Sequence, residues 1–312
     1  MNLVDKDTGG DPMTTTKYAR RSLRQIVLEL ADLGHKASPT TVADLLRDQD
    51  YALHVNVKRF TGPAHAERDA QFHYLQDWIE LFADEDLPII SVDTKKKELI
   101  GNFANAGATW SLTGDVVNAH DFRQDASCRA VPYGIYDYLA NRGHVIIGTS
   151  ADTPAFAVDA IVQWWQRYGA GRYPQAEQLL ILADAGGSNG CRPRLWKQSL
   201  QTRLADPFGL TVIVCHYPPG ASKWNPVEHR LFSAISTNWA GIPLRSLDIM
   251  QACLHGTKTQ TGLTVTSQLN RRLYRKGIKV SATQMGELDI EYHETCPQWN
   301  YSIYPRQMEL LN

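Results

Sequence analysis

The chain has 312 residues, and its 32 Lys and Arg side chains nearly balance 33 Asp and Glu side chains, for a formal net charge of −1. This length corresponds to about two domains of roughly 150 residues each, which can bury a sizeable core without disulfides or metals. The longest apolar run, residues 179–183, is far shorter than the roughly 18 residues of a membrane helix.

The N-terminus has neither the basic start nor the apolar stretch of a signal peptide. The five cysteines form no C-x-x-C pair, which argues against a disulfide scaffold or a zinc knuckle. We therefore expect a reduced, cytoplasmic enzyme or regulator.

Two short helices are predicted near the N-terminus. Apolar side chains at helical spacing between residues 23 and 33 predict the first helix, and Gly34 ends it. Ser38 as an N-cap and Pro39 at the first helical position begin the second. Two helices joined by a tight turn are the outline of a helix-turn-helix, although an ordinary helical hairpin has the same pattern. Residues 1–62 are expected to form this segment, and residues 63–312 a second domain.

Positive charge gathers in the first segment. Between residues 17 and 59, eight Lys and Arg face five Asp and Glu, and this local excess of three suits contact with phosphates. The segment is therefore a candidate DNA-binding segment. Its candidate DNA-contacting side chains are Arg20, Arg21, Thr40, Thr41 and Arg47.

Beyond residue 63, strand-like and helix-like patterns alternate. The expected strands are residues 87–92, 131–138, 144–148, 179–183 and 210–215. The expected helices are residues 64–83 and three that begin after Asp152, after Gly190 and at Asn225. This alternation predicts a mixed α/β sheet with helices on its faces.

Three acids stand where such a sheet binds ligands. Asp93 and Asp184 each end a predicted strand, and Glu228 follows the third strand in the first turn of a helix. Ligands gather at the carboxyl ends of strands in open α/β sheets. Three carboxylates without His or Cys neighbours suit Mg²⁺ or Mn²⁺, and two such ions support phosphoryl transfer. For any single strand-end Asp, a cap or turn former is the commoner role.

The residues just before Glu228 predict how its helix begins. Asn225 is expected to cap the helix, Pro226 to occupy its first position, and Glu228 to lie on its opening turn. The helix dipole favours an anion there.

Three sequence blocks, in order, carry a family resemblance. They are Asp93-Thr94-Lys95-Lys96-Lys97-Glu98, residues 183–190 (ADAGGSNG) and residues 216–229 (HYPPGASKWNPVEH), followed by Arg230-Leu231-Phe232-Ser233. They resemble the motifs of DDE transposases of bacterial insertion sequences, and especially the Rhodopirellula-type transposase DDE-domain family. The resemblance extends from about residue 10 to residue 304.

The resemblance implies a ribonuclease-H-like fold, a mixed sheet flanked by helices, with a basic C-terminal extension. It implies metal-dependent cleavage at transposon ends and transfer of the 3′-hydroxyl into target DNA. Asp93, Asp184 and Glu228 would be the catalytic metal ligands, with two Mg²⁺ ions, or Mn²⁺, as cofactors. The implied partners are double-stranded DNA, as terminal inverted repeats and target, and a second copy of the chain in a homodimer or larger assembly. The implied location is the bacterial nucleoid.

Several side chains are candidates for DNA contact around this core. Lys95, Lys96 and Lys97 are expected to contact phosphate beside the acids, with a solvated strand exit as the alternative. His229 and Arg230 flank Glu228 and are expected to reach DNA, with ion pairs to neighbouring acids as the alternative. Lys223 and Trp224 come just before the helix, and Trp224 is expected in the core rather than stacked on a base.

The C-terminal third has the larger local excess of positive charge. Between residues 223 and 279, nine Lys and Arg face two acids, an excess of seven. The densest cluster is the best candidate for a DNA-backbone surface, with a solubilising loop as the alternative. The cluster consists of Arg271, Arg272, Arg275, Lys276 and Lys279.

Two other classes fit parts of the pattern. One is a catalytically idle, domesticated or truncated helix-turn-helix regulator. Family members usually carry more sequence before the helix-turn-helix, so a truncated copy or a start codon assigned too late is considered. The other is a ribonuclease-H-like nuclease acting on RNA–DNA hybrids, with the same acids.

Overall fold

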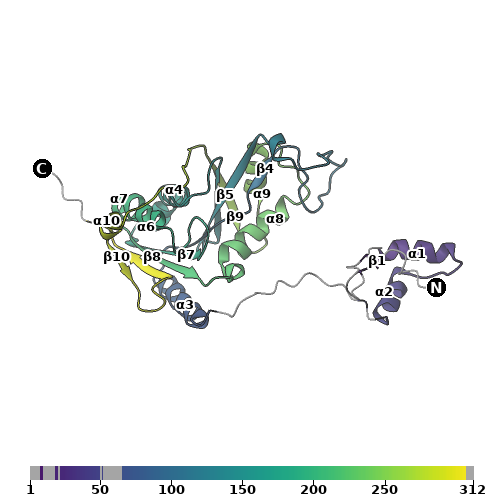
Figure 1. The fold of residues 1–312 in the computed structure, drawn as a ribbon, viewed down its shortest axis with the longest axis horizontal. Helices are drawn as coiled ribbons and strands as arrows, with labels where there is room; N and C mark the ends of the chain where they lie inside the picture. The colour runs from purple at the N-terminus through teal and green to yellow at the C-terminus, as the bar shows by residue number, and fades with distance from the viewer. Residues whose placement is uncertain (1–7, 10–17, 20–21, 50, 52–64, 307–312) are drawn as a thin grey trace. The chain divides into compact units, whose positions relative to one another are not determined.

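The computed structural model describes residues 8–9, 18–19, 22–49, 51 and 65–306. The chain divides into two compact units, residues 1–61 and 62–312, which are described separately (Figure 1). Arg20 and Arg21, two of the expected DNA contacts, lie outside the described residues.

The described residues of the first unit form two helices and a short strand pair. Its elements are β1 (Thr8–Gly9), β2 (Tyr18–Ala19), α1 (Leu23–Asp32) and α2 (Pro39–Arg47). The expected start of the second helix is confirmed, because Ser38 accepts the N–H of Thr41 at 3.1 Å and Pro39 is the first helical residue. Gly34 has φ +84°, a left-handed value that costs glycine little, and follows Leu33, the C-cap of α1. Ile26 and Val42 are the buried side chains of the two helices.

The second unit alternates strands and helices. Its elements are α3 (Arg68–Asp84), β3 (Ile89–Thr94), β4 (Glu98–Ile100), η2 (Arg123–Asp125), β5 (Cys128–Asp137), β6 (Arg142–Gly148), α4 (Pro154–Trp164), η3 (Trp165–Gly169), α5 (Ala170–Arg172), β7 (Gln178–Asp184), α6 (Arg194–Leu200), η4 (Gln201–Ala205), α7 (Asp206–Phe208), β8 (Thr211–Tyr217), η5 (Ser222–Trp224), η6 (Val227–Phe232), α8 (Ser233–Asn238), α9 (Leu247–Gly256), β9 (Thr264–Asn270), α10 (Ala282–Gly286), β10 (Ile290–Tyr292) and β11 (Asn300–Ile303). The segments η3, η4 and η6 are π-helical.

One mixed sheet of nine strands organises this unit. Its order is β10-β11-β8-β7-β3-β5-β6-β9, and β4 pairs with β5. The neighbours β3, β7 and β8 are parallel, whereas β5 is antiparallel to both β3 and β6. The central order β6-β5-β3-β7-β8, with helices on both faces, confirms the expected ribonuclease-H-like mixed sheet.

Helices cover both faces of the sheet, and alternate residues of each strand serve the two faces. On one face, α4 and α6 pack through Trp164 and Trp196 against a cluster that includes Ile181. On the other face, α3 packs against Leu180 of the same strand, β7, while η6, α8 and α9 cover β5 and β6 (Figure 1).

Glycine in β5 lets η6 lie directly on the sheet. A Cβ at Gly134 would collide with the Phe232 ring and would lie 3.1 Å from Cγ2 of Val227. Gly134 is paired with Asp93 across β3 and β5. The missing side chain therefore sets how closely the helix that carries Glu228 approaches the strand that carries Asp93.

We expect Gly134→Ala to destabilise the protein by about 1–3 kcal/mol, because an added methyl group must displace a packed ring. Chemical denaturation measures this loss. The matched control is Gly171→Ala, where a Cβ meets nothing within 4 Å. Equal stability of the two variants would contradict the close approach of η6.

Candidate active site

The ends of β3 and β7 bring two acids side by side. Val92 pairs with Ala183 across these parallel strands, so the residues that follow, Asp93 and Asp184, are neighbours. Ser91, two residues before Asp93 and therefore on the same face, bonds the first residue of η6. The carboxylate of Asp93 thus projects from the sheet face that η6 covers.

Glu228 joins these two acids from the first turn of η6, as expected from the sequence. Its carboxylate forms a hydrogen bond with that of Asp93. Burial, followed by repulsion from Asp184, raises the pKa of Glu228. The structure therefore brings together all three acids that the sequence singles out.

The cluster holds a proton more tightly than an ordinary carboxyl group does. Burial, together with the charges of Asp184 and Glu228, raises the pKa of Asp93 from its ordinary value of 3.8 to about 8. The N–H of Thr94, which donates to Asp93 Oδ1 at 2.7 Å, opposes this shift. Burial also raises the pKa of Asp184. The site thus stabilises positive charge among its carboxyl groups.

The buried amide of Asn225 ties the elements of the site together. Its Nδ2 donates to Asp184 Oδ1 at 3.0 Å and to the Val92 carbonyl at 3.4 Å. Its Oδ1 accepts from the Ser91 hydroxyl, which itself accepts the N–H of Val227 at 2.8 Å. One side chain therefore connects β3, β7 and the start of η6.

The expected helix-capping role of Asn225 is wrong. The helix begins at Val227, so Pro226 holds the N-cap position and not the expected first helical position, and the Asn225 side chain does not cap the helix. The amide turns inward instead, because Ser91 and Asp184 supply partners that a buried polar group requires.

The three acids offer oxygen donors alone. Hard cations such as Mg²⁺ and Mn²⁺ prefer such donors. Among the described residues, no group of three or more His, Cys, Asp or Glu side chains is arranged so that it could hold a metal ion. Carboxylates repel one another, so these three would close into a ligand set only around a cation. Both the oxygen donors of these acids and the proton that they share are consistent with a cation site.

Lys95 lies beside the acids but is largely buried. Its Nζ is 3.3 Å from Glu98 Oε1 and 4.7 Å from the centre of the Trp239 ring, and its side chain is 10% exposed. Its charge lowers the pKa of Glu228 against the effect of burial. This lysine therefore acts on the acidic cluster itself, whereas Lys96 is exposed.

Asp152 is a neighbour of the acids that sequence analysis took only as a helix start. It accepts a hydrogen bond from the Thr94 hydroxyl at 3.2 Å and pairs with Lys97 Nζ at 3.0 Å. Asp152 could have been identified in the sequence by its position shortly after the strand β6. This strand runs in the same direction as β3, because both are antiparallel to β5. The carboxyl ends of these strands meet at one edge.

The other expected DNA contacts of the second unit lie on its surface. Arg230 is exposed and lines a cavity of about 440 Å³ with His229 and Lys258. Lys223 Nζ lies 5.3 Å from the centre of the Trp224 ring. Trp224 is 53% exposed, so its expected place in the core is wrong. In the basic cluster, Arg271, Arg275, Lys276 and Lys279 are exposed, and Arg272 pairs with Asp159 at 3.0 Å.

In the first unit, the expected contacts on α2 are exposed. Thr40, Thr41 and Arg47 all face solvent within this unit. Arg47 forms an ion pair with Asp44 at 2.5 Å, three residues before it on the helix.

Comparison with known proteins decides the family. The family described as Rhodopirellula transposase DDE domain matches residues 1–305. The chain belongs to that family. This match confirms the resemblance noted in the sequence. As a member of a DDE transposase family, the chain functions in transposition.

Solved structures of Mos1 transposase are similar to the family member described here. The Mos1 mariner paired-end complex with Mn matches with a TM-score of 0.44 and 13% identity, covering 80% of this chain and 73% of that one. The Mos1 paired-end complex with the left transposon end has a TM-score of 0.43 and 14% identity, covering 78% and 71%. No curated protein matches the chain. In the described part of the chain, no helix has the length and apolar character needed to cross a membrane.

We expect Asn225→Ala to destabilise the protein by about 1–3 kcal/mol, because it leaves buried polar partners without a hydrogen bond. Urea denaturation of the variant measures the loss. The control is Asn238→Ala, which removes a hydrogen bond from an exposed asparagine to the Cys253 carbonyl. If both substitutions cost the same, Asn225 does not tie the site together.

The contribution of Asp93 to the stability of the metal-free protein should fall as pH rises from about 4 to about 8. The folded state binds the Asp93 proton in this window and the unfolded chain does not, because the folded pKa is about 8 and the ordinary value is 3.8. Asp93→Asn removes this titration. Between about pH 5 and pH 8, its stability relative to wild type should rise by about 1 kcal/mol or more. Denaturation in EDTA measures the difference, and a pH-independent difference contradicts the shared proton.

Proposed function

We propose that this transposase-family chain cuts DNA at the ends of a mobile element and joins the freed 3′-hydroxyl to target DNA, with Asp93, Asp184 and Glu228 as its catalytic residues. The observation that supports this most is the meeting of three acids from β3, β7 and η6 with a proton held among them. Acids held this close together, with raised pKa values, are typical of a functional site.

The proposed cofactor is Mg²⁺, with Mn²⁺ able to replace it and two ions in the site. The all-carboxylate donor set favours these hard cations. When bound, such ions activate the attacking oxygen and stabilise the leaving oxygen of an in-line displacement. Asn225 holds the Asp184 carboxylate in place by its hydrogen bond at 3.0 Å.

The proposed partners are double-stranded DNA and a second copy of the chain. We propose that residues 1–62 are the DNA-binding segment, with Thr40, Thr41 and Arg47 at the duplex, because these exposed side chains share α2. Residues 63–312 would be the catalytic domain. Lys96, Lys223 and Arg230 are exposed around the acids and suit contact with DNA phosphates. Cutting two element ends together would require a dimer or a larger assembly of this chain. The proposed location of this assembly is the nucleoid.

The test is cleavage of a duplex that carries the native element end, in the presence of Mg²⁺. Alanine at Asp93, Asp184 or Glu228 should reduce cleavage by about 100-fold or more, because metal ions supply several kcal/mol to the transition state. Glu177→Ala is the matched control for Asp184→Ala, since Glu177 is an exposed acid just before β7 and Asp184 ends the same strand.

Binding of the same duplex should persist in all four variants. Cleavage that survives Asp184→Ala would refute the assignment of the acids. Duplex binding by a wild-type protein that never cleaves would instead favour the idle regulator.

A further inference from the structure

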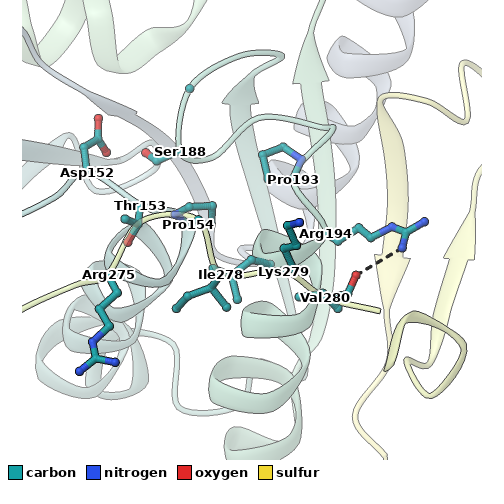
Figure 2. A pocket seen from close by; sticks show the side chains of 13 residues that line it. Asp152, Thr153, Pro154, Ser188, Pro193, Arg194, Arg275, Ile278, Lys279 and Val280 are labelled. Carbon is teal, nitrogen blue, oxygen red and sulfur yellow. Dashed lines mark hydrogen bonds between the residues drawn. The ribbon is translucent and has the colours of Figure 1, made fainter. Parts of the chain in front are cut away.

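The basic segment 271–280, here called the strap, is fastened at both ends. Near its start, Arg272 Nη1 lies 3.0 Å and the Tyr274 hydroxyl 2.8 Å from Asp159 Oδ2 on α4. At its end, Arg194 Nη1 donates to the Val280 carbonyl at 3.3 Å, the dashed line in Figure 2. The strap therefore has a fixed course although it has no helix or strand.

A cavity of about 630 Å³ lies between the strap, the residues that begin α4, and the loop after β7. Figure 2 shows the strap passing alongside Pro154, with Lys279 directed toward Pro193. Cavities of about 300–1,000 Å³ are the usual size for small-ligand sites. One nucleotide unit is a ligand of that class, whereas an intact duplex, with its bases paired in its interior, is not.

The cavity begins at the candidate active site. Asp152 and Ser188 line it. Both contact the Thr94 hydroxyl, at 3.2 Å and 3.3 Å, and Thr94 follows Asp93 and donates its N–H to that carboxyl group. A DNA strand at the acids would therefore need to extend by only a short distance to enter.

The lining combines the two chemical characters of a nucleotide site. Arg275 and Lys279 are exposed cations that form no ion pair within the part of the chain that the structure describes. The one acid in the lining, Asp152, is already paired with Lys97. Pro154 and Ile278 supply apolar surface, against which a base can lie while its phosphate faces the cations.

We propose that this cavity binds an unpaired nucleotide of the DNA strand that continues past the candidate active site, with the phosphates on its two sides near Arg275 and Lys279. The inference rests on the proposed function, since that function supplies the strand. It adds a single-strand subsite to a protein whose other proposed DNA contacts are with duplex.

The strap provides its own matched control. Arg275→Ala/Lys279→Ala removes the two cations of the cavity, whereas Arg271→Ala/Lys276→Ala removes two exposed cations of the same strap outside it. Both double variants change the net charge equally. Circular dichroism checks that each is folded.

The measured quantity is a ratio of affinities, taken in EDTA so that no DNA is cut. A duplex ending at the element's end is compared with the same duplex carrying a short single-stranded extension, on each strand in turn. Wild type should bind one extended duplex more tightly by about tenfold, the effect of one charge-assisted hydrogen bond. Arg275→Ala/Lys279→Ala should lose this advantage, and Arg271→Ala/Lys276→Ala should retain it.

The proposal fails if wild type gains nothing from either extension, or if both double variants lose the gain equally. It also fails if a fully paired extension gives the same gain with the same dependence on Arg275 and Lys279. Because binding is measured without metal, these outcomes are independent of whether Asp184→Ala abolishes cleavage.

Discussion

The geometry of the site depends on the amide of Asn225. Its hydrogen bonds to Ser91, Val92 and Asp184 hold two strands and the start of η6 in one arrangement. Without them, Asp184 would lose the hydrogen bond that holds its carboxylate, and repulsion among the acids would drive the carboxylates apart. The Asn225 amide positions the acidic cluster without neutralising it, as a buried lysine at the same place would do. The negative charge of the acids is therefore left for a cation.

The five central strands, β3 and β5 to β8, and the three acids were accessible from the sequence, because their signals are local, whereas β4, β9, β10 and β11 were not predicted. A short apolar run ending in Asp, as at residues 89–93 and 179–184, indicates both the strand and the place of the acid at its end. The first-unit helices were equally predictable, because Ser38 and Pro39 act within one turn. Such signals depend on near neighbours in the chain.

The remainder depends on partners that are distant in sequence. The direction of the Asn225 side chain is decided by Ser91, 134 residues away. The course of the strap is decided by Asp159, 113 residues from Arg272. The Trp224 ring lies at the surface, where its centre is 6.1 Å from the centre of the Phe72 ring. The spacing of residues along the chain does not predict these contacts, because each forms only when the sheet is assembled.

The close contact between Gly134 and Phe232 has a consequence for how this sequence can change over time. A side chain at position 134 fits only if the ring at position 232 becomes smaller. Each substitution is harmful alone: one introduces a clash, and the other leaves a void beneath the helix that bears Glu228. The two positions are therefore coupled, and a lineage that changes them one at a time passes through an intermediate in which the packing of η6 is disturbed.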